Sequence, residues 1–219
     1  MWNNAGVDEV ERWFIRTRCE AVTEALKKNR IQAFYAATKD DAKKKVLQMI
    51  PKDASVGVAG SVTIRQLGLI ESLEKRGNQL FHHWKPGLTD EGGVQERKKE
   101  NSADILLASS NAITTDGKLV NACATGNRVA GMLFGPKTVI LVAGYNKIVE
   151  DIDAAIWRIK NIVTPMNAKR HGRDLPCART TFCTDCRAEM RQDCVITIIE
   201  MRTWRTDLCV ILVGERLGF

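Results

Sequence analysis

The feature that most constrains the fold is the run Thr138 to Gly144 (TVILVAG), which is apolar and rich in β-branched residues. A strand with one solvated face would alternate apolar and polar residues, so an uninterrupted run of this kind is typical of a parallel strand buried on both faces. Parallel strands need crossover connections, usually helices, and this requirement points to an α/β architecture. Asn146 and Lys147 follow the run at its carboxyl end, the edge of an open parallel sheet at which ligands bind.

Strand and helix patterns alternate along the rest of the chain. An amphipathic helix is predicted from about Asp8 to Lys28, and Ile31 to Ala37, Ala54 to Ala59 and Asp104 to Ser109 are strand candidates separated by helical segments. We count about six parallel strand candidates, a hairpin and two C-terminal runs. The sequence therefore predicts an α/β fold with a mainly parallel sheet and helices on both faces, organised as a single domain over residues 1–219.

Two turns are candidates for binding an anion. Asp116-Gly117 has the composition of a hairpin turn, and the hairpin is followed by Thr125-Gly126-Asn127-Arg128 at the predicted start of a helix. Backbone amides and a guanidinium at a helix N-terminus attract anions. The second turn, Gly60-Ser61-Val62-Thr63, lies between a strand and a helix, where it can cradle a phosphate or carboxylate, or where Ser61 can simply cap the helix.

Because these turns follow strands of one sheet, Arg128 and Lys147 are expected to face the same cleft as Ser61 and Thr63. Cys123 lies just before Thr125-Gly126-Asn127-Arg128, and a thiolate is favoured near the helix start that this turn forms. Cys123 is therefore a candidate nucleophile or additional ligand; the alternative is a small residue that only packs at the end of a strand. The candidate catalytic residues are Cys123, Arg128 and Lys147, and the candidate anion-binding residues are Gly60, Ser61, Thr63, Asn111, Thr125, Gly126, Asn127, Arg128 and Asn146.

Cysteines concentrate in residues 168–194, where apolar periodicity is lost. Cys177, Cys183, Cys186 and Cys194 form the pattern C-x5-C-x2-C-x7-C. Four thiolates at these separations can hold one iron-sulfur cluster or one zinc ion. Zinc usually takes two closely spaced pairs, and this segment has one, so we favour an iron-sulfur cluster, of the 4Fe-4S type, over zinc. Buried thiols without a metal are the third alternative.

Histidines supply a weaker signal. His82 and His83 are adjacent on a predicted strand, Gln79 to Trp84, and adjacent strand residues point to opposite faces. They are therefore not expected to share one metal.

Charge and hydropathy limit the partners. The net charge of +7 is distributed among acids, which favours solvated helix faces over a nucleic-acid partner. Apolar runs of about eight residues or fewer are too short to span a bilayer, which needs roughly twenty. We expect a cytoplasmic protein without a membrane span, and self-association into a homo-oligomer stays open.

With NAITTDGKLVN, TGNRVAGMLFGPKTVILVAGYNKI, PCARTTFCTDC, VITIIE and ILVGERLGF in view, the chain resembles LUD-domain proteins of the lactate-utilisation type over nearly its whole length. The resemblance implies a fold similar to the ribose-5-phosphate isomerase and CoA-transferase superfamily, with the ligand turn at Gly60-Ser61-Val62-Thr63. It also implies a link to lactate oxidation together with iron-sulfur partner proteins. The chain differs from its relatives at Cys123-Ala124-Thr125, where Asp-Gly-Thr is usual, and this difference draws attention to Cys123.

Three functions follow as hypotheses. The first is an enzyme or enzyme subunit that binds a small anionic metabolite and an iron-sulfur cluster in redox or hydroxy-acid metabolism. The second is a non-catalytic iron-sulfur accessory or electron-transfer protein, and the third is a zinc-stabilised nucleic-acid-binding protein. Whether the chain is an enzyme is left undecided by the sequence.

Overall fold

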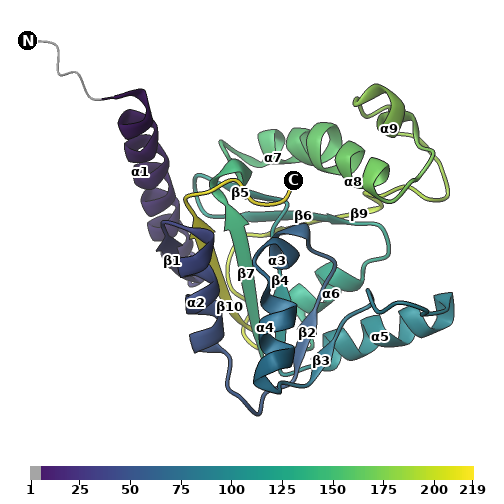
Figure 1. The fold of residues 1–219 in the computed structure, drawn as a ribbon. Helices are drawn as coiled ribbons and strands as arrows, with labels where there is room; N and C mark the ends of the chain where they lie inside the picture. Colours follow the sequence, from purple (N-terminus) through teal and green to yellow (C-terminus); the bar gives the residue numbers. More distant parts are fainter. Residues whose placement is uncertain (1–5) are drawn as a thin grey trace, which may run out of the picture.

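The main sheet of the protein contains six parallel strands, in the order β1-β10-β7-β4-β2-β3. The computed structural model describes residues 6–219 (Figure 1). The predicted α/β class is confirmed, and the run that defined it is strand β7, with the predicted bounds. The strands are β1 (Gln32–Ala36), β2 (Val56–Val58), β3 (Leu80–Phe81), β4 (Ile105–Ala108), β7 (Thr138–Gly144) and β10 (Asp207–Val213).

Helices cover both faces of this sheet, as predicted. Alternate strand residues face opposite sides, so Val56 and Val58 pack with α2 (Lys39–Met49), α3 (Val62–Gln66) and α4 (Leu69–Arg76). The opposite face packs against α1 (Val7–Lys28) and α6 (Asn127–Leu133). On that side Gly57 meets α5 (Asp90–Ser102). The sequence predicts a charged helix only near Gln95 to Asn101, and α5 begins earlier because Thr89 caps it and Gly92 and Gly93 lie inside its first turns.

A second sheet, which the sequence patterns do not predict, has the strand order β8-β5-β6-β9. The expected hairpin forms its centre, and Gly117 in the turn has a φ of 84°. The C-terminal run Val195 to Ile199, which the sequence predicts as a strand outside the parallel candidates, pairs antiparallel with β6. The strands are β5 (Ala112–Thr114), β6 (Leu119–Cys123), β8 (Ile148–Val149) and β9 (Val195–Ile199).

A long helical segment covers the outer face of the second sheet (Figure 1). The sequence predicts one helix from Glu150 to about Ala168, whereas the structure starts it after Asp151, whose carboxylate accepts the amide of Ala154 at 2.8 Å. A π-helical stretch interrupts it, so it is divided into α7 (Ile152–Arg158), η2 (Ile159–Val163) and α8 (Thr164–Arg170).

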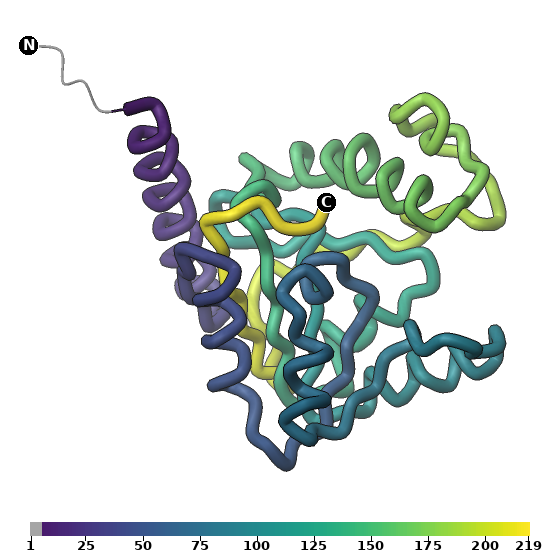
Figure 2. The backbone as a smooth tube through the Cα atoms, in the orientation of Figure 1, coloured from purple at the N-terminus to yellow at the C-terminus, as the bar shows by residue number. Residues whose placement is uncertain are grey.

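Two short elements and the chain end complete the surroundings of the site. A 3-10 turn, η1 (Tyr145–Lys147), follows β7, and α9 (Pro176–Thr180) begins the cysteine segment. The C-terminal tail returns from β10 across the molecule to α3, where the amide of Gly218 donates to Oε1 of Gln66 at 2.7 Å (Figure 2). Within residues 6–219, no helix combines the length and the apolar character that crossing a membrane requires.

Candidate anion-binding site

A pocket of about 310 Å³ lies at the carboxyl ends of β2, β4 and β7. Its walls are the Gly60–Thr63 turn, the end of β6 with the start of α6, and α8 with the loop after α9. Ligands of open parallel sheets bind at this edge. Of the candidate catalytic and anion-binding residues, the pocket brings together Gly60, Ser61, Thr63, Asn111, Cys123, Thr125, Asn127, Arg128 and Lys147.

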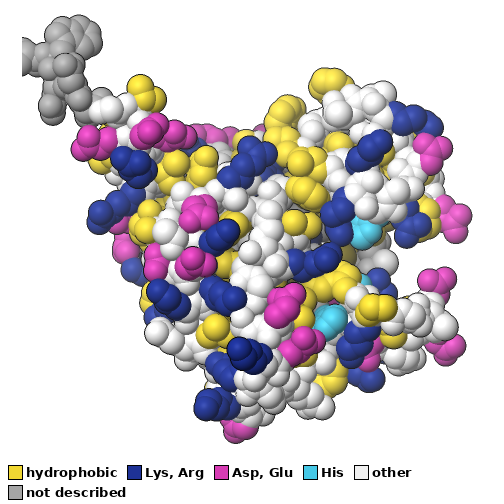
Figure 3. All heavy atoms as spheres, in the orientation of Figure 1, with side chains coloured by type: hydrophobic (Ala, Val, Ile, Leu, Met, Phe, Trp, Pro, Cys, Tyr) yellow, Lys and Arg dark blue, Asp and Glu magenta, His cyan; other side chains and the backbone are white. Residues whose placement is uncertain are grey.

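The pocket is strongly cationic. Its lining includes six Lys and Arg side chains and one carboxylate side chain, and Figure 3 shows Lys, Arg and His side chains gathered around the hollow between the α8–α9 side and the α5 side. Among them only Arg191 forms ion pairs with described residues, to Asp185 and Asp193. A cleft lined by one sign of charge concentrates ligands of the opposite sign. The charged lining residues are Arg97, Arg128, Lys147, Arg170, Arg173, Arg191 and Glu189.

Lys147 is the most buried of these cations, with 4% of its surface exposed. Its Nζ donates to Oγ1 of Thr63 at 3.0 Å and to Oγ of Ser109 at 2.8 Å, and both partners are neutral. Burial, together with the nearby positive charges of Arg158 and Arg128, lowers the pKa of Lys147 well below its usual value. The charged form of this buried lysine has only neutral partners, so a bound anion would stabilise it.

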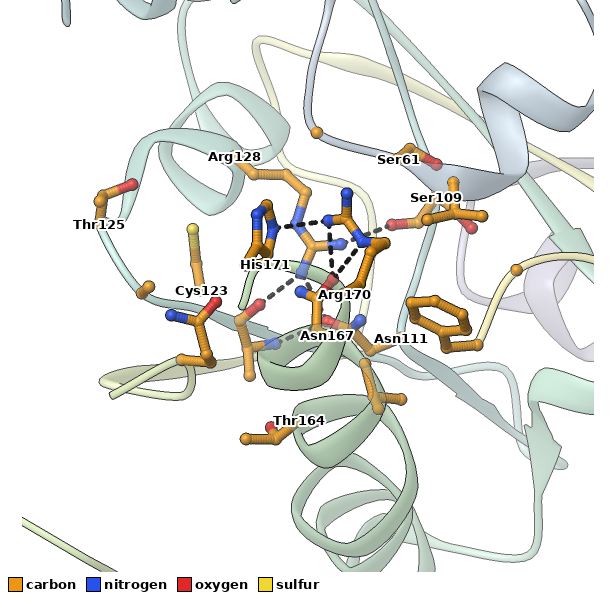
Figure 4. Close-up of a pocket in the computed structure, with 18 of the residues that line it drawn as sticks. Ser61, Ser109, Asn111, Cys123, Thr125, Arg128, Thr164, Asn167, Arg170 and His171 are labelled. Atoms are coloured by element: carbon orange, nitrogen blue, oxygen red, sulfur yellow. Dashed lines mark hydrogen bonds between the residues drawn. The ribbon is translucent and has the colours of Figure 1, made fainter. Parts of the chain in front are cut away.

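Arg128 reaches from α6 into the centre of the site (Figure 4). Its guanidinium donates to the backbone oxygens of Ser109 and Ala122 and to the side-chain oxygen of Asn111. All three acceptors are neutral, and burial lowers the pKa of Arg128. The guanidinium therefore connects the end of β4 with the second sheet. Among the described residues, no carboxylate forms an ion pair with it.

The Gly60 turn caps a helix and lines the pocket, and its role in binding an anion stays a prediction. Ser61 caps α3, with its Oγ accepting the amide of Ile64 at 3.3 Å, and it also lines the pocket. Thr63 lines the pocket, and its Oγ1 accepts the hydrogen bond from Nζ of Lys147. The cap fixes the start of α3 at the wall of the cationic pocket.

Cys123 is half-buried at the pocket wall, at the end of β6. Burial raises the pKa of its thiol, but the charge of Arg128 and the backbone amides of Arg128, Gly126 and Thr125 outweigh burial and leave the pKa below its ordinary value. The structure therefore gives Cys123 the surroundings of a thiolate.

Two predicted anion-binding residues do not line the pocket. Asn146 accepts the amide of Leu217 through Oδ1 at 3.0 Å, and its backbone oxygen accepts from Arg158, so it holds the C-terminal tail. Gly126 serves α6 as the N-terminal cap, with a φ of 84°. Both stand next to residues that do line the pocket.

Other lining residues were not predicted. Arg170 contacts Asn167 at 2.8 Å and His171 at 2.6 Å, and the α8 wall carries all three into the pocket (Figure 4). The basic cluster at Lys169-Arg170-His171 was the available signal, but no pattern in the sequence places α8 over the carboxyl edge of the main sheet. His83 also lines the pocket, from the turn after β3, which ends at Phe81, earlier than the predicted strand.

The cysteine segment forms a second, smaller pocket. Cys177, Cys183 and Cys186 line it together with Asp193, whereas Cys194 is exposed outside it, with Sγ 3.3 Å from the backbone oxygen of Arg191. Burial and the neighbouring charges of Cys183, Cys186 and Asp193 raise the pKa of the Cys177 thiol. Across residues 6–219, no three His, Cys, Asp or Glu side chains lie close enough together to hold a metal ion. The metal site stays a prediction.

The two pockets are neighbours, because Thr164, Arg191 and Gln192 line both. Fold and site together define an α/β protein with a cationic ligand pocket at the carboxyl edge of a parallel sheet and a cysteine-lined pocket beside it.

Comparison with known proteins gives the family. The chain belongs to the LUD-domain family, because the model of the LUD domain matches residues 19–213. The crystal structure of a DUF162 family protein from Deinococcus radiodurans is similar, with a TM-score of 0.51 and 13% identity, over 93% of this chain and 98% of that chain. This likeness concerns the fold alone. A comparison with curated proteins finds no match.

Proposed function

We propose that this LUD-domain protein binds a small anionic metabolite, a 2-hydroxy acid of the lactate type, and acts in redox or hydroxy-acid metabolism. The observation that carries the proposal is the buried side chain of Lys147, which has two neutral hydroxyl partners and no carboxylate among the described residues, in a pocket with five further cations; a bound anion would stabilise its charged form. A buried charge is costly unless it is paired, so a bound carboxylate would complete the site.

Each side of the pocket would contribute to binding such an acid. Lys147 and Arg128 supply positive charge to the carboxylate, and the amides at the start of α3 supply neutral donors. The pocket volume of about 310 Å³ exceeds what lactate fills, so a larger hydroxy acid or a second small molecule fits as well.

We also propose that Cys177, Cys183 and Cys186 hold an iron-sulfur cluster, with zinc as the alternative. Two observations support the fit: the three thiols line one pocket, and the amide of Asp185 lies 3.4 Å from Sγ of Cys183, a contact typical of turns that present metal-bound thiolates. Such a cluster supplies one-electron chemistry when bound. Binding would require the sulfurs to move closer together, and Cys194 would have to turn inward to become a fourth ligand.

The binding proposal is tested by calorimetric titration with L-lactate, D-lactate and related hydroxy acids. Replacing Arg128 by Ala or Lys147 by Met should weaken binding by about 1.5 to 3 kcal/mol, roughly ten- to hundredfold, because a charge-assisted hydrogen bond is lost. The matched control is Arg16→Ala, which removes an exposed arginine that pairs with Glu20 on α1, far along the sequence from the site. Equal affinity in all four proteins would contradict the proposal.

The cluster proposal is tested by iron and sulfide analysis and absorption spectra of protein purified without oxygen. Cys177→Ser, Cys183→Ser and Cys186→Ser should each lose the cluster, while Cys209→Ser, a buried cysteine in β10, should keep it. If the three variants bind iron as well as the parent, the cysteines are not ligands. Cluster binding without turnover of any hydroxy acid would favour the accessory or electron-transfer function.

A further inference from the structure

One carboxylate beside the pocket is completely buried and belongs to none of the groups described so far. Glu100, on α5, has no exposed surface. Its Oε1 accepts the backbone amide of His83 at 2.8 Å and lies 2.6 Å from Nδ1 of the same residue. Its Oε2 is buried and has no partner among residues 6–219. His83 therefore supplies both hydrogen-bond contacts of this carboxylate among the described residues.

This pairing decides which nitrogen of His83 is available to a ligand. A carboxylate only accepts hydrogen bonds, so the contact with Oε1 requires the proton on Nδ1. In the neutral ring Nε2 is then the acceptor. No hydrogen bond between described residues uses Nε2, and Nε2 lies 3.5 Å from the point where a Cβ would stand on Gly60. The acceptor nitrogen thus lies against the Gly60 turn, in the wall of the pocket.

The pair is held in place by close backbone packing. A Cβ on Gly57 would lie 2.1 Å from the backbone oxygen of Glu100, so β2 and α5 approach each other as only glycine allows. The ring of Trp84 packs beside His83, with centroids 5.2 Å apart. The orientation of the imidazole is therefore set by the fold before any ligand binds.

We propose that His83, positioned by Glu100, is the proton acceptor for the hydroxyl group of the bound 2-hydroxy acid. This inference rests on the proposed function. In the step the O–H bond breaks, a bond forms between the proton and Nε2, and the electron pair stays on the oxygen. Glu100 balances the resulting imidazolium, and the cations of the pocket face the oxyanion. Glu100 is a positioning residue, since it acts through His83.

Other charged groups surround the ring and require a control. Arg97 lies one turn before Glu100 on α5, Arg65 on α3 packs over Trp84 at 5.5 Å, and α8 brings Arg170 and His171 to the same pocket. These positive groups would attract the carboxylate of any ligand, whether or not the ligand has a hydroxyl group. A ligand pair that differs only in the hydroxyl group separates the role of His83 from theirs.

The experiment compares L-lactate with propionate, which lacks the hydroxyl, by calorimetric titration of the complete protein. Wild-type protein should prefer lactate by about three- to tenfold, the value of one hydrogen bond. His83→Phe, which has a ring but no acceptor, should abolish the preference, and retained propionate binding would show that the variant is folded.

A spectroscopic arm tests Glu100. In protein carrying ¹⁵N-labelled histidine, His83 should show the Nδ1–H tautomer, and Glu100→Gln should shift it toward Nε2–H, because an amide can donate to Nδ1. If both acids bind through Lys147 but His83→Phe retains the lactate preference, the inference fails and the proposed function stands. If neither acid binds to the wild-type protein, both fail.

Discussion

Lys147 illustrates how a single residue can carry a site. A lysine just after a buried strand is not by itself evidence of a binding site. Lys147 is informative because its two hydrogen-bond partners, Oγ1 of Thr63 and Oγ of Ser109, are neutral and follow different strands. Arg158, buried on α7, is likewise a cation whose hydrogen-bond partners are neutral, since it donates to the backbone oxygens of Asn111 and Asn146. Burial lowers the pKa of Arg158 to about 10. These groups concentrate positive charge behind the pocket.

The lowered pKa of Lys147 predicts a pH-dependent stability. Between the folded-state pKa and the unfolded value of about 10.5, the unfolded chain binds more protons than the folded chain, so stability rises with pH in that window. Relative to Lys147→Met, the wild-type protein should gain up to about 1.4 kcal/mol of unfolding free energy per pH unit there. Urea denaturation of both proteins at pH 7 to 10 measures the difference. A constant difference across this range would show that the lysine is not desolvated.

The contact between β2 and α5 is the clearest constraint at the level of elements. Gly57 lies in the middle of β2 and faces the backbone of Glu100, so the strand can approach the last turn of α5. The same helix end receives Gly131 of α6, where a Cβ would lie 2.3 Å from Oδ1 of Asn101. Two glycines therefore bring α5 into the position from which Glu100 reaches His83.

Gly57→Ala should therefore destabilise the protein by at least about 1 to 3 kcal/mol, because the new methyl group overlaps backbone atoms that cannot move independently. Gly6→Ala is the matched control, since a Cβ at Gly6 meets nothing within 4 Å, and its effect should stay within about 0.5 kcal/mol. Chemical denaturation measures both. Similar stabilities of the two variants would mean that α5 is not packed against β2 as described.

At the scale of the whole molecule, the pocket forms where separately built layers meet. The main sheet supplies the Gly60 turn, Ser109 and Lys147, the second sheet supplies Cys123, and α8 closes the site from above (Figure 1). Each layer contributes positive charge or hydrogen-bond donors. The assembled protein therefore contains charge that no single layer balances.

A bound anion should stabilise this assembly. A ligand at one hundred times its Kd adds about 2.7 kcal/mol to the unfolding free energy, which for a protein of this size raises Tm by roughly 5 to 10 °C. Thermal unfolding with and without L-lactate measures the shift. It should be much smaller for Lys147→Met, and absent for the uncharged analogue 1,2-propanediol. An equal shift with the diol would mean that the stabilisation is not electrostatic.

The sequence by itself determined the features that depend on local physics. The α/β class and the bounds of β7 followed from an uninterrupted apolar run, and the hairpin turn at Gly117 and the cap at Ser61 followed from residue preferences within a few positions. Lys147 and Arg128 were placed near one another because parallel strands end at the same edge. Each of these predictions uses information contained within one segment or one general rule of sheet topology.

Only the tertiary structure decided which distant segments meet. β9 has the apolar pattern of a sheet strand, yet its partner is β6, more than seventy residues earlier, and the pairing depends on which edge the packed layers leave open. The hydrogen bond between His83 and Glu100 connects the turn after β3 with the last turn of α5. It depends on the close approach of β2 to α5 that Gly57 allows. The sulfur positions in the cysteine pocket likewise depend on how the loop packs. Such contacts are set by complementary packing and charge between elements, which no periodicity within one segment encodes.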